Sequence, residues 1–116
     1  MPIHLELTEA VQAVLQKMVE EKDHWQRVCG NLRSENGENR GDCIHAFLRS
    51  EPLAWYLMRL KDTGDPCKAL TAAKEQANLI CARANYRRER EVCIDPWAYF
   101  RGLEAWHVKL LNAAEV

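Results

Sequence analysis

The sequence contains no apolar run that approaches the roughly 20 residues needed to span a bilayer. Its net charge is only -1, with 16 basic and 17 acidic residues. The first absence argues against a transmembrane helix, and the second against general affinity for phosphates or anionic lipid. The N-terminus has no basic region followed by an apolar one, so we expect no cleaved signal.

Closely spaced pairs of cysteines or histidines, of the kind that bind zinc, are also missing. The five cysteines are odd in number and widely spaced, at positions 29, 43, 67, 81 and 93. We therefore predict no metal site and no cofactor. Wide spacing in a chain of this length favours reduced thiols over a disulfide framework. From this we expect five free cysteines and a cytoplasmic protein.

Strand alternation is absent, and the hairpin-type pair Asn36-Gly37 has no alternating flanks. The chain instead shows apolar residues spaced three and four apart, which predicts an amphipathic helix and not a strand. Because no glycine or proline interrupts this stripe before Gly30, we expect a long helix on which the others pack. The stripe consists of Leu7, Val11, Val14, Met18, Trp25, Val28 and Leu32.

Capping and turn residues divide the chain. Thr8 is expected to cap the first helix, because its hydroxyl can accept from a backbone N–H of the first turn. Asp-Pro occurs at Asp65-Pro66 and again at Asp95-Pro96, and it favours a helix start because Asp caps and Pro fits the first turn. We predict a single all-α domain over residues 1–116, a compact bundle of four to five helices. After the first helix, the expected elements are a polar loop at 34–41, short segments at 43–49 and 51–61 that Pro52 separates, and helices at 66–90 and 96–113.

The carboxylates and thiols are not spaced in a way that predicts a catalytic site. Glu20 and Asp23 have the spacing of one half of the metal-binding carboxylate motif of all-α nucleotide pyrophosphatases, but Glu75 and Glu89 do not make a convincing second half. Cys67 lies in a first helical turn with no histidine near it in sequence. We therefore expect a protein that is not an enzyme and keep a carboxylate-metal enzyme as the second alternative.

The one basic concentration lies at the end of the helix expected at 66–90. Its arginines suit the negative end of a helix dipole, and Tyr86 among them offers a ring on which a base can stack. Glu89 and Glu91 dilute the positive charge. A nucleic-acid-binding regulator is therefore the first alternative. The arginines are Arg83, Arg87, Arg88 and Arg90.

Apolar surface is in excess on two helices. Leu79 and Tyr86 are seven residues apart and face away from the alanine-rich stripe of their helix. The last helix is apolar over well over half its circumference, whereas one neighbour needs a stripe of roughly 100°. Either this helix is buried from two sides, or one face binds a partner. The predicted partner-binding residues are Leu79, Arg83, Tyr86, Arg90 and Trp106.

This excess of apolar surface indicates a binding role, since protein interfaces are enriched in aromatic residues, Met and Arg. The leading hypothesis is a small non-enzymatic regulator or inhibitor that occupies a surface of a larger protein. In size, class and lack of chemistry it is comparable to bacterial anti-activators and phage-encoded anti-defence proteins, which is an analogy only. The expected partner is a protein, with self-association as a homodimer as a further option. Nucleic acid ranks second, and no membrane partner is expected.

Overall fold

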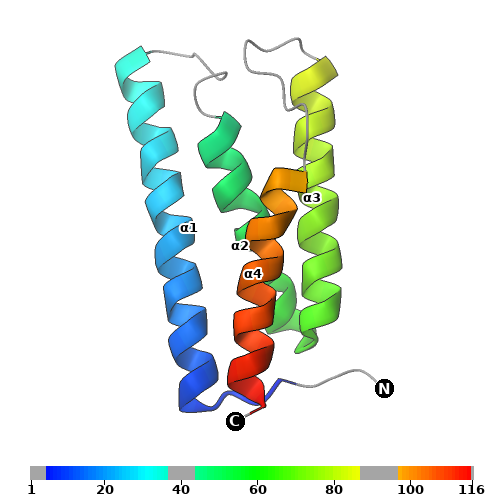
Figure 1. Cartoon of the computed structure of the whole chain (residues 1–116). Helices are drawn as coiled ribbons and strands as arrows, with labels where there is room; N and C mark the ends of the chain where they lie inside the picture. The colour runs from blue at the N-terminus through cyan, green and yellow to red at the C-terminus, as the bar shows by residue number, and fades with distance from the viewer. Residues whose placement is uncertain (1–4, 37–43, 87–96, 116) are drawn as a thin grey trace.

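The structure is a computed structural model that describes residues 5–36, 44–86 and 97–115, without the side chains of 29–36, 44–45, 83–86 and 97–98. Successive helices run in opposite directions, and α4 lies in front of α2, between α1 and α3 (Figure 1). The predicted all-α bundle is confirmed, and no strand occurs in the described ranges. The helices are α1 (Glu9–Asn36), α2 (Ile44–Thr63), α3 (Pro66–Tyr86) and α4 (Trp97–Ala114).

Two helices begin at the side-chain caps that the sequence predicts. Thr8 Oγ1 accepts a hydrogen bond from the backbone N–H of Val11 at 3.2 Å, so α1 begins at the next residue, Glu9. Asp65 Oδ1 accepts from the N–H groups of Cys67 and Lys68, at 2.9 and 3.4 Å. Each cap satisfies donors that the first turn of a helix otherwise leaves unpaired.

The middle of the chain differs from the prediction because α2 runs through Pro52 without a break. Proline removes one backbone hydrogen bond and normally kinks or ends a helix. Here Pro52 and its neighbour Leu53 are buried, and so is Leu48 one turn earlier. Packing on both sides of the proline holds the two expected segments, 43–49 and 51–61, as one helix.

A glycine ends α2 and turns the chain into α3. Gly64 has a positive φ of 67°, a conformation that costs a residue with a Cβ roughly 1–2 kcal/mol. Its N–H donates to the carbonyl of Leu60 at 2.8 Å, and its own carbonyl accepts from Leu5 at 3.0 Å. The glycine therefore closes the helix and also fixes the segment that leads into α1.

All four helices contribute to the main core. Tyr56, Met18 and Leu110 are among its largest fully buried side chains. A second cluster joins α2, α3 and α4 around Leu48 and Phe100. α4 is thus buried along the side that faces the other helices. The main core consists of Val11, Met18, Leu53, Tyr56, Leu60, Ala69, Ala73, Leu103 and Leu110.

The apolar stripe predicted for α1 is only partly buried in the core. Val11 and Met18 are fully buried, whereas Trp25 is half-buried beside Ala46. Leu7 was expected in the stripe but is 66% exposed. It precedes the cap residue Thr8 and therefore lies outside the helix, where the three-and-four spacing no longer applies. Leu32 has its side chain outside the described residues.

The alanine stripe of α3 packs inward as predicted, since Ala69, Ala73 and Ala77 have no exposed surface. Cys81 continues this stripe and is 4% exposed. It is disulfide-bonded, with its partner outside the described side chains, so the expectation of five free cysteines is wrong. Cys67 is a free and exposed thiol. Wide spacing of cysteines along the chain does not exclude a disulfide once the helices pack.

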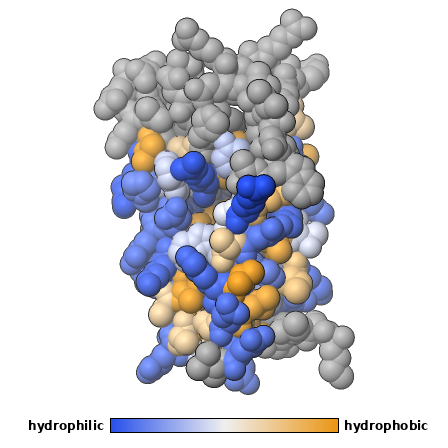
Figure 2. All heavy atoms as spheres, viewed as in Figure 1, coloured by the Kyte–Doolittle hydropathy of each residue, from blue (hydrophilic) through white to orange (hydrophobic). Residues whose placement is uncertain are grey.

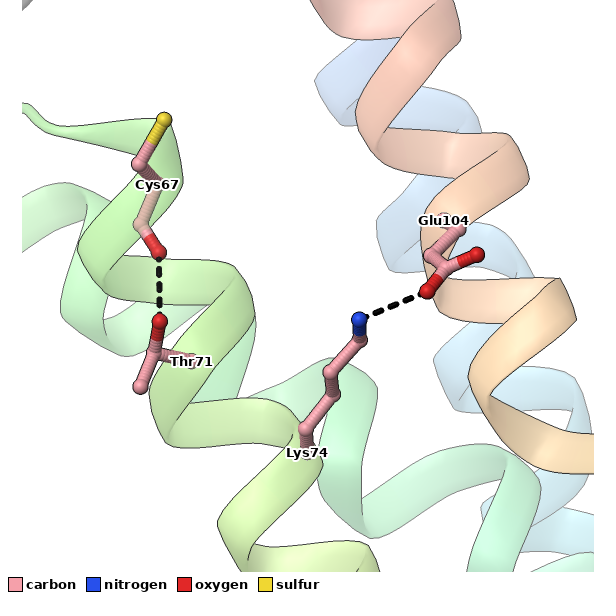
Figure 3. Close-up of polar contacts among 4 residues, drawn as sticks. All are labelled: Cys67, Thr71, Lys74 and Glu104. Atoms are coloured by element: carbon pink, nitrogen blue, oxygen red, sulfur yellow. Dashed lines mark hydrogen bonds and ion pairs between the residues drawn. The ribbon is translucent and has the colours of Figure 1, made fainter. Parts of the chain in front are cut away.

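The flank between α3 and α4 is polar. Lys74 of α3 reaches Glu104 of α4 with its Nζ 2.6 Å from Oε1 (Figure 3). Both side chains are partly exposed, and such pairs contribute only about 0–1 kcal/mol. The pair therefore helps to set the register of α4 on α3, while the buried side chains supply most of the stability.

The face of the molecule on the α4 side is mostly hydrophilic where it is described, with apolar atoms gathered in its lower half (Figure 2). None of the described helices is long and apolar enough to cross a bilayer.

Candidate partner-binding groove

The residues predicted to bind a partner do not gather in one described place. Leu79 is 47% exposed on α3, as its position in the pattern predicted. Arg83 and Tyr86 belong to the last turn of α3, but their side chains lie outside the described residues, and so does all of Arg90. Trp106 is on α4, half-buried against the main core. Of the predicted surface, the structure places only Leu79 and Trp106.

Trp106 lines a groove of about 350 Å³ between α1 and α4, with α2 beneath it. Leu79 is not among the residues that line it. Because the groove holds Trp106, it is the described site closest to the predicted one. The described residues that line it are Glu21 of α1, Leu48, Arg49 and Leu53 of α2, and Tyr99, Gly102, Leu103 and Trp106 of α4.

The floor of this α1–α4 groove is aliphatic. Leu48 and Leu53 are each 2% exposed, and Leu103 is 6% exposed. These leucines belong to the two core clusters, so packing on the opposite side holds them in place. Nearly all of their surface is therefore buried in the core, and the groove exposes only a small part of each leucine.

Two aromatic residues of α4 line the groove, with a glycine between them in the sequence. Tyr99 and Trp106 are seven residues apart, which is two turns or about 10 Å along a helix. A Cβ built on Gly102 meets no heavy atom within 4 Å. The space next to Gly102 is therefore open, and no packing contact requires a glycine there.

The rim carries one charge of each sign, joined through Trp25. The indole N–H of Trp25 donates to Glu21 Oε1 at 2.9 Å. The guanidinium of Arg49 lies over the same ring, with Cζ 4.5 Å from its centroid. Trp25 thereby holds the acidic group of α1 and the basic group of α2 in place. On the other side, Lys109 Nζ lies 4.6 Å from the centroid of Trp106.

A second hollow of about 550 Å³ lies between α2 and α3. It contains the exposed thiol of Cys67, which sits in the first turn of α3 (Figure 3). Its described lining includes no histidine, so it offers no imidazole base for nucleophilic chemistry. The described lining is Arg59, Thr63, Cys67, Lys68, Thr71, Ala72 and Glu75.

The carboxylate pair considered for metal binding does not form a site with other ligands. Asp23 lies 3.2 Å from Lys22 Nζ, and Glu20 accepts a hydrogen bond from Gln16. Over residues 5–36, 44–86 and 97–115, no three His, Cys, Asp or Glu side chains are grouped to hold a metal ion.

One polar pair lies inside the bundle. Tyr56 Oη is 3.0 Å from His107 Nδ1. Burial, and secondarily the charge of Cys67, raises the pKa of Tyr56, so its O–H stays protonated. Which of the two groups donates depends on the tautomer of His107. Burial, and secondarily Lys74, lowers the pKa of His107, which Glu104 partly opposes. The folded protein therefore favours a neutral histidine at this position.

We expect stability to fall as the pH drops through the ordinary histidine range near ~6.5. His107 has a lower pKa when folded, so the unfolded chain binds the proton first, and stability is full only above the unfolded pKa. Replacing His107 with Gln keeps an acceptor for Tyr56 and removes the titration. Urea unfolding between pH 5.5 and 8 should show a shallower pH slope for His107→Gln. Equal slopes in the two proteins would contradict this assignment.

Several groove residues were not predicted as part of a site. Glu21 bonds Trp25, and Arg49 stacks on the same ring. Gly102 lies between two aromatic residues on one helix face, a signal that was present in the sequence.

No family model, curated protein or solved structure matches this chain. The groove itself is therefore the basis on which a function can be proposed.

Proposed function

We propose that this protein is a small non-enzymatic regulator or inhibitor that occupies a surface of a larger protein through the α1–α4 groove. One observation carries the proposal: Tyr99 and Trp106 of α4 line a groove over Leu48, Leu53 and Leu103, and a Cβ at Gly102 would meet no atom within 4 Å. A glycine inside a helix costs about 0.5–1 kcal/mol relative to alanine. Since no neighbouring atom requires it, an open groove is a reason to retain it.

The groove has the composition of a protein-binding site. Its centre is apolar and aromatic, and its rim carries Glu21 and Arg49, both exposed. Energetic hot spots in interfaces have this arrangement of a desolvated pocket inside a polar ring. The described lining holds no cysteine, serine or histidine to act as a nucleophile or its base. Binding is therefore the function that this arrangement supports best.

The cellular compartment in which the protein meets its partner should be tested more widely than the sequence suggested. The expectation of a cytoplasmic protein rested on five free cysteines, whereas Cys81 is disulfide-bonded. Disulfides persist in oxidising compartments and are rare in the cytoplasm of most cells. A search for the partner should therefore include both cytoplasmic and extracytoplasmic fractions of the source cells.

Capture from these fractions, with quantitative mass spectrometry, tests the proposal. We expect one protein enriched by the wild-type chain and lost with Gly102→Leu, which fills the groove. Leu79→Glu, on the exposed face of α3, is the matched variant at the other predicted surface and should retain the partner. Loss with Leu79→Glu alone would move the site to α3.

Two further outcomes separate the alternatives. Recovery of the chain itself, with a dimer in light scattering, would show self-association through the groove. Capture that follows nucleic acid and weakens steeply with salt would favour the arginine-rich end of α3. Either result would contradict a larger protein as the partner.

A further inference from the structure

A polar contact inside the bundle joins α2 to α4. Tyr56 of α2 has no exposed surface, and its Oη lies 3.0 Å from Nδ1 of His107 on α4. The two rings meet edge to face, with their centroids 6.1 Å apart and their planes at 81°. Because a buried hydroxyl needs a hydrogen-bond partner, Tyr56 depends on the position of His107 and therefore on the docking of α4.

The imidazole of His107 can exchange protons with solvent while the bundle stays folded, because this side chain is only partly buried. A neutral imidazole has one nitrogen that donates and one that accepts, whereas a protonated imidazole has two that donate. After protonation, Nδ1 can no longer accept the proton of the Tyr56 hydroxyl. The hydroxyl itself is buried, so water does not readily replace that acceptor.

The charges next to His107 also oppose a second cation. Glu104 lies one turn before it on α4, but Oε1 of this carboxylate is already 2.6 Å from Nζ of Lys74 on α3 (Figure 3). α1 reaches the same core through apolar side chains such as Val14. A protonated imidazole would therefore meet Lys74 as a like charge and share Glu104 with it. Burial, and secondarily Lys74, lowers the pKa of His107, and Glu104 opposes this shift only in part.

We infer that His107 is a pH-sensitive contact that holds α4 against α2 while its imidazole is neutral and lets α4 open locally once the imidazole is protonated. The sign follows from the lowered pKa of the docked histidine. An opened α4 binds the proton more readily than a docked one, so docking is complete above the ordinary histidine range near ~6.5 and weakens below it. Because α4 carries Tyr99 and Trp106, acid would loosen that side of the α1–α4 groove.

Amide hydrogen exchange of the wild-type chain at pH 5.5 and 7.5, followed by NMR, tests this assignment without any partner. The lower pH lies between the ordinary carboxyl and histidine ranges, near ~4 and ~6.5. Opening of one helix exposes its own amides while the other helices stay protected. We expect the protection factors of α4 relative to those of α1 to fall at least about threefold at pH 5.5.

Three variants assign the effect to the cluster. His107→Gln keeps a hydrogen-bonding group for Tyr56 and removes the titration, so the ratio of α4 to α1 protection should no longer depend on pH. His24→Gln, at an exposed histidine of α1, is the matched control and should respond as wild type does. Lys74→Met keeps the length of the side chain and frees Glu104 to pair with the protonated imidazole, so the response should shrink.

The expected pattern can fail in three ways, each of which overturns the inference. Equal loss of protection in α1 and α4 would show that acid acts on the whole fold and not on the docking of α4. A pH response that persists in His107→Gln would assign it to another group. An unchanged response in Lys74→Met would remove the charged pair from the device, and this variant and wild type give a result even where His107→Gln does not fold. None of these results bears on whether the α1–α4 groove binds a protein, which the capture experiment decides separately.

Discussion

Replacing Met18 with alanine is expected to lower the free energy of unfolding by about 2–5 kcal/mol. Met18 is fully buried in the main core, where side chains from all four helices meet. The substitution removes apolar contacts and leaves a cavity that the surrounding helices fill only in part. Small domains are stable by only about 5–15 kcal/mol, so this single change removes a large share of the free energy of unfolding. Urea or thermal unfolding followed by circular dichroism measures it.

Met58→Ala is the matched control, because the residue type and the change are the same. Met58 is 45% exposed on α2, and surface substitutions usually stay within about 0.5 kcal/mol. Similar losses for the two variants would show that α1 does not pack as described. Trp25→Ala should cost less than the ~3–5 kcal/mol of a fully buried aromatic residue, since Trp25 is only half-buried.

The parts of the fold that depend on neighbouring residues in the sequence, such as helix caps and helix faces, were predictable. Thr8 and Asp65 cap helices as their side chains predict, and the alanine stripe of α3 packs inward. Pro52 misled the prediction because its effect depends on packing. A proline costs one hydrogen bond locally, whereas burial of Leu48 and Leu53 around it is decided by the other helices.

The groove was harder to predict, because an open space between helices depends on how the whole bundle packs. The broad apolar surface of α4 predicted either burial from two sides or a partner surface. α4 packs on its neighbours through Phe100, Leu103 and Leu110, while Tyr99 and Trp106 border the groove. Only the packed bundle shows which flank stays open. Likewise, the disulfide at Cys81 forms only where packing brings a second cysteine to it, which spacing along the chain does not reveal.

Gly102→Leu is expected to stabilise the protein and weaken binding strongly at the same time. Leucine is favoured over glycine in a helix by about 0.5–1 kcal/mol, and a Cβ at this position meets no atom within 4 Å. The new side chain fills the space between Tyr99 and Trp106 that we assign to the partner. Losing a hot-spot contact costs about 2–4 kcal/mol, so binding should weaken roughly 100-fold.

Opposite effects on stability and binding distinguish a blocked site from a damaged fold. Most substitutions that impair function by unfolding lower stability as well. Ala105→Leu is the matched control, since Ala105 is an exposed position on α4 that does not line the groove. It adds the same side chain one turn away and should leave affinity unchanged.

Isothermal titration of the captured partner into wild type, Gly102→Leu and Ala105→Leu decides whether the groove is the binding site. We expect equal affinity for wild type and Ala105→Leu, and a roughly 100-fold weaker Kd for Gly102→Leu. Thermal melts of the same samples should show that Gly102→Leu is at least as stable as wild type. Full-strength binding by a folded Gly102→Leu would show that the open space between Tyr99 and Trp106 is not where this protein binds.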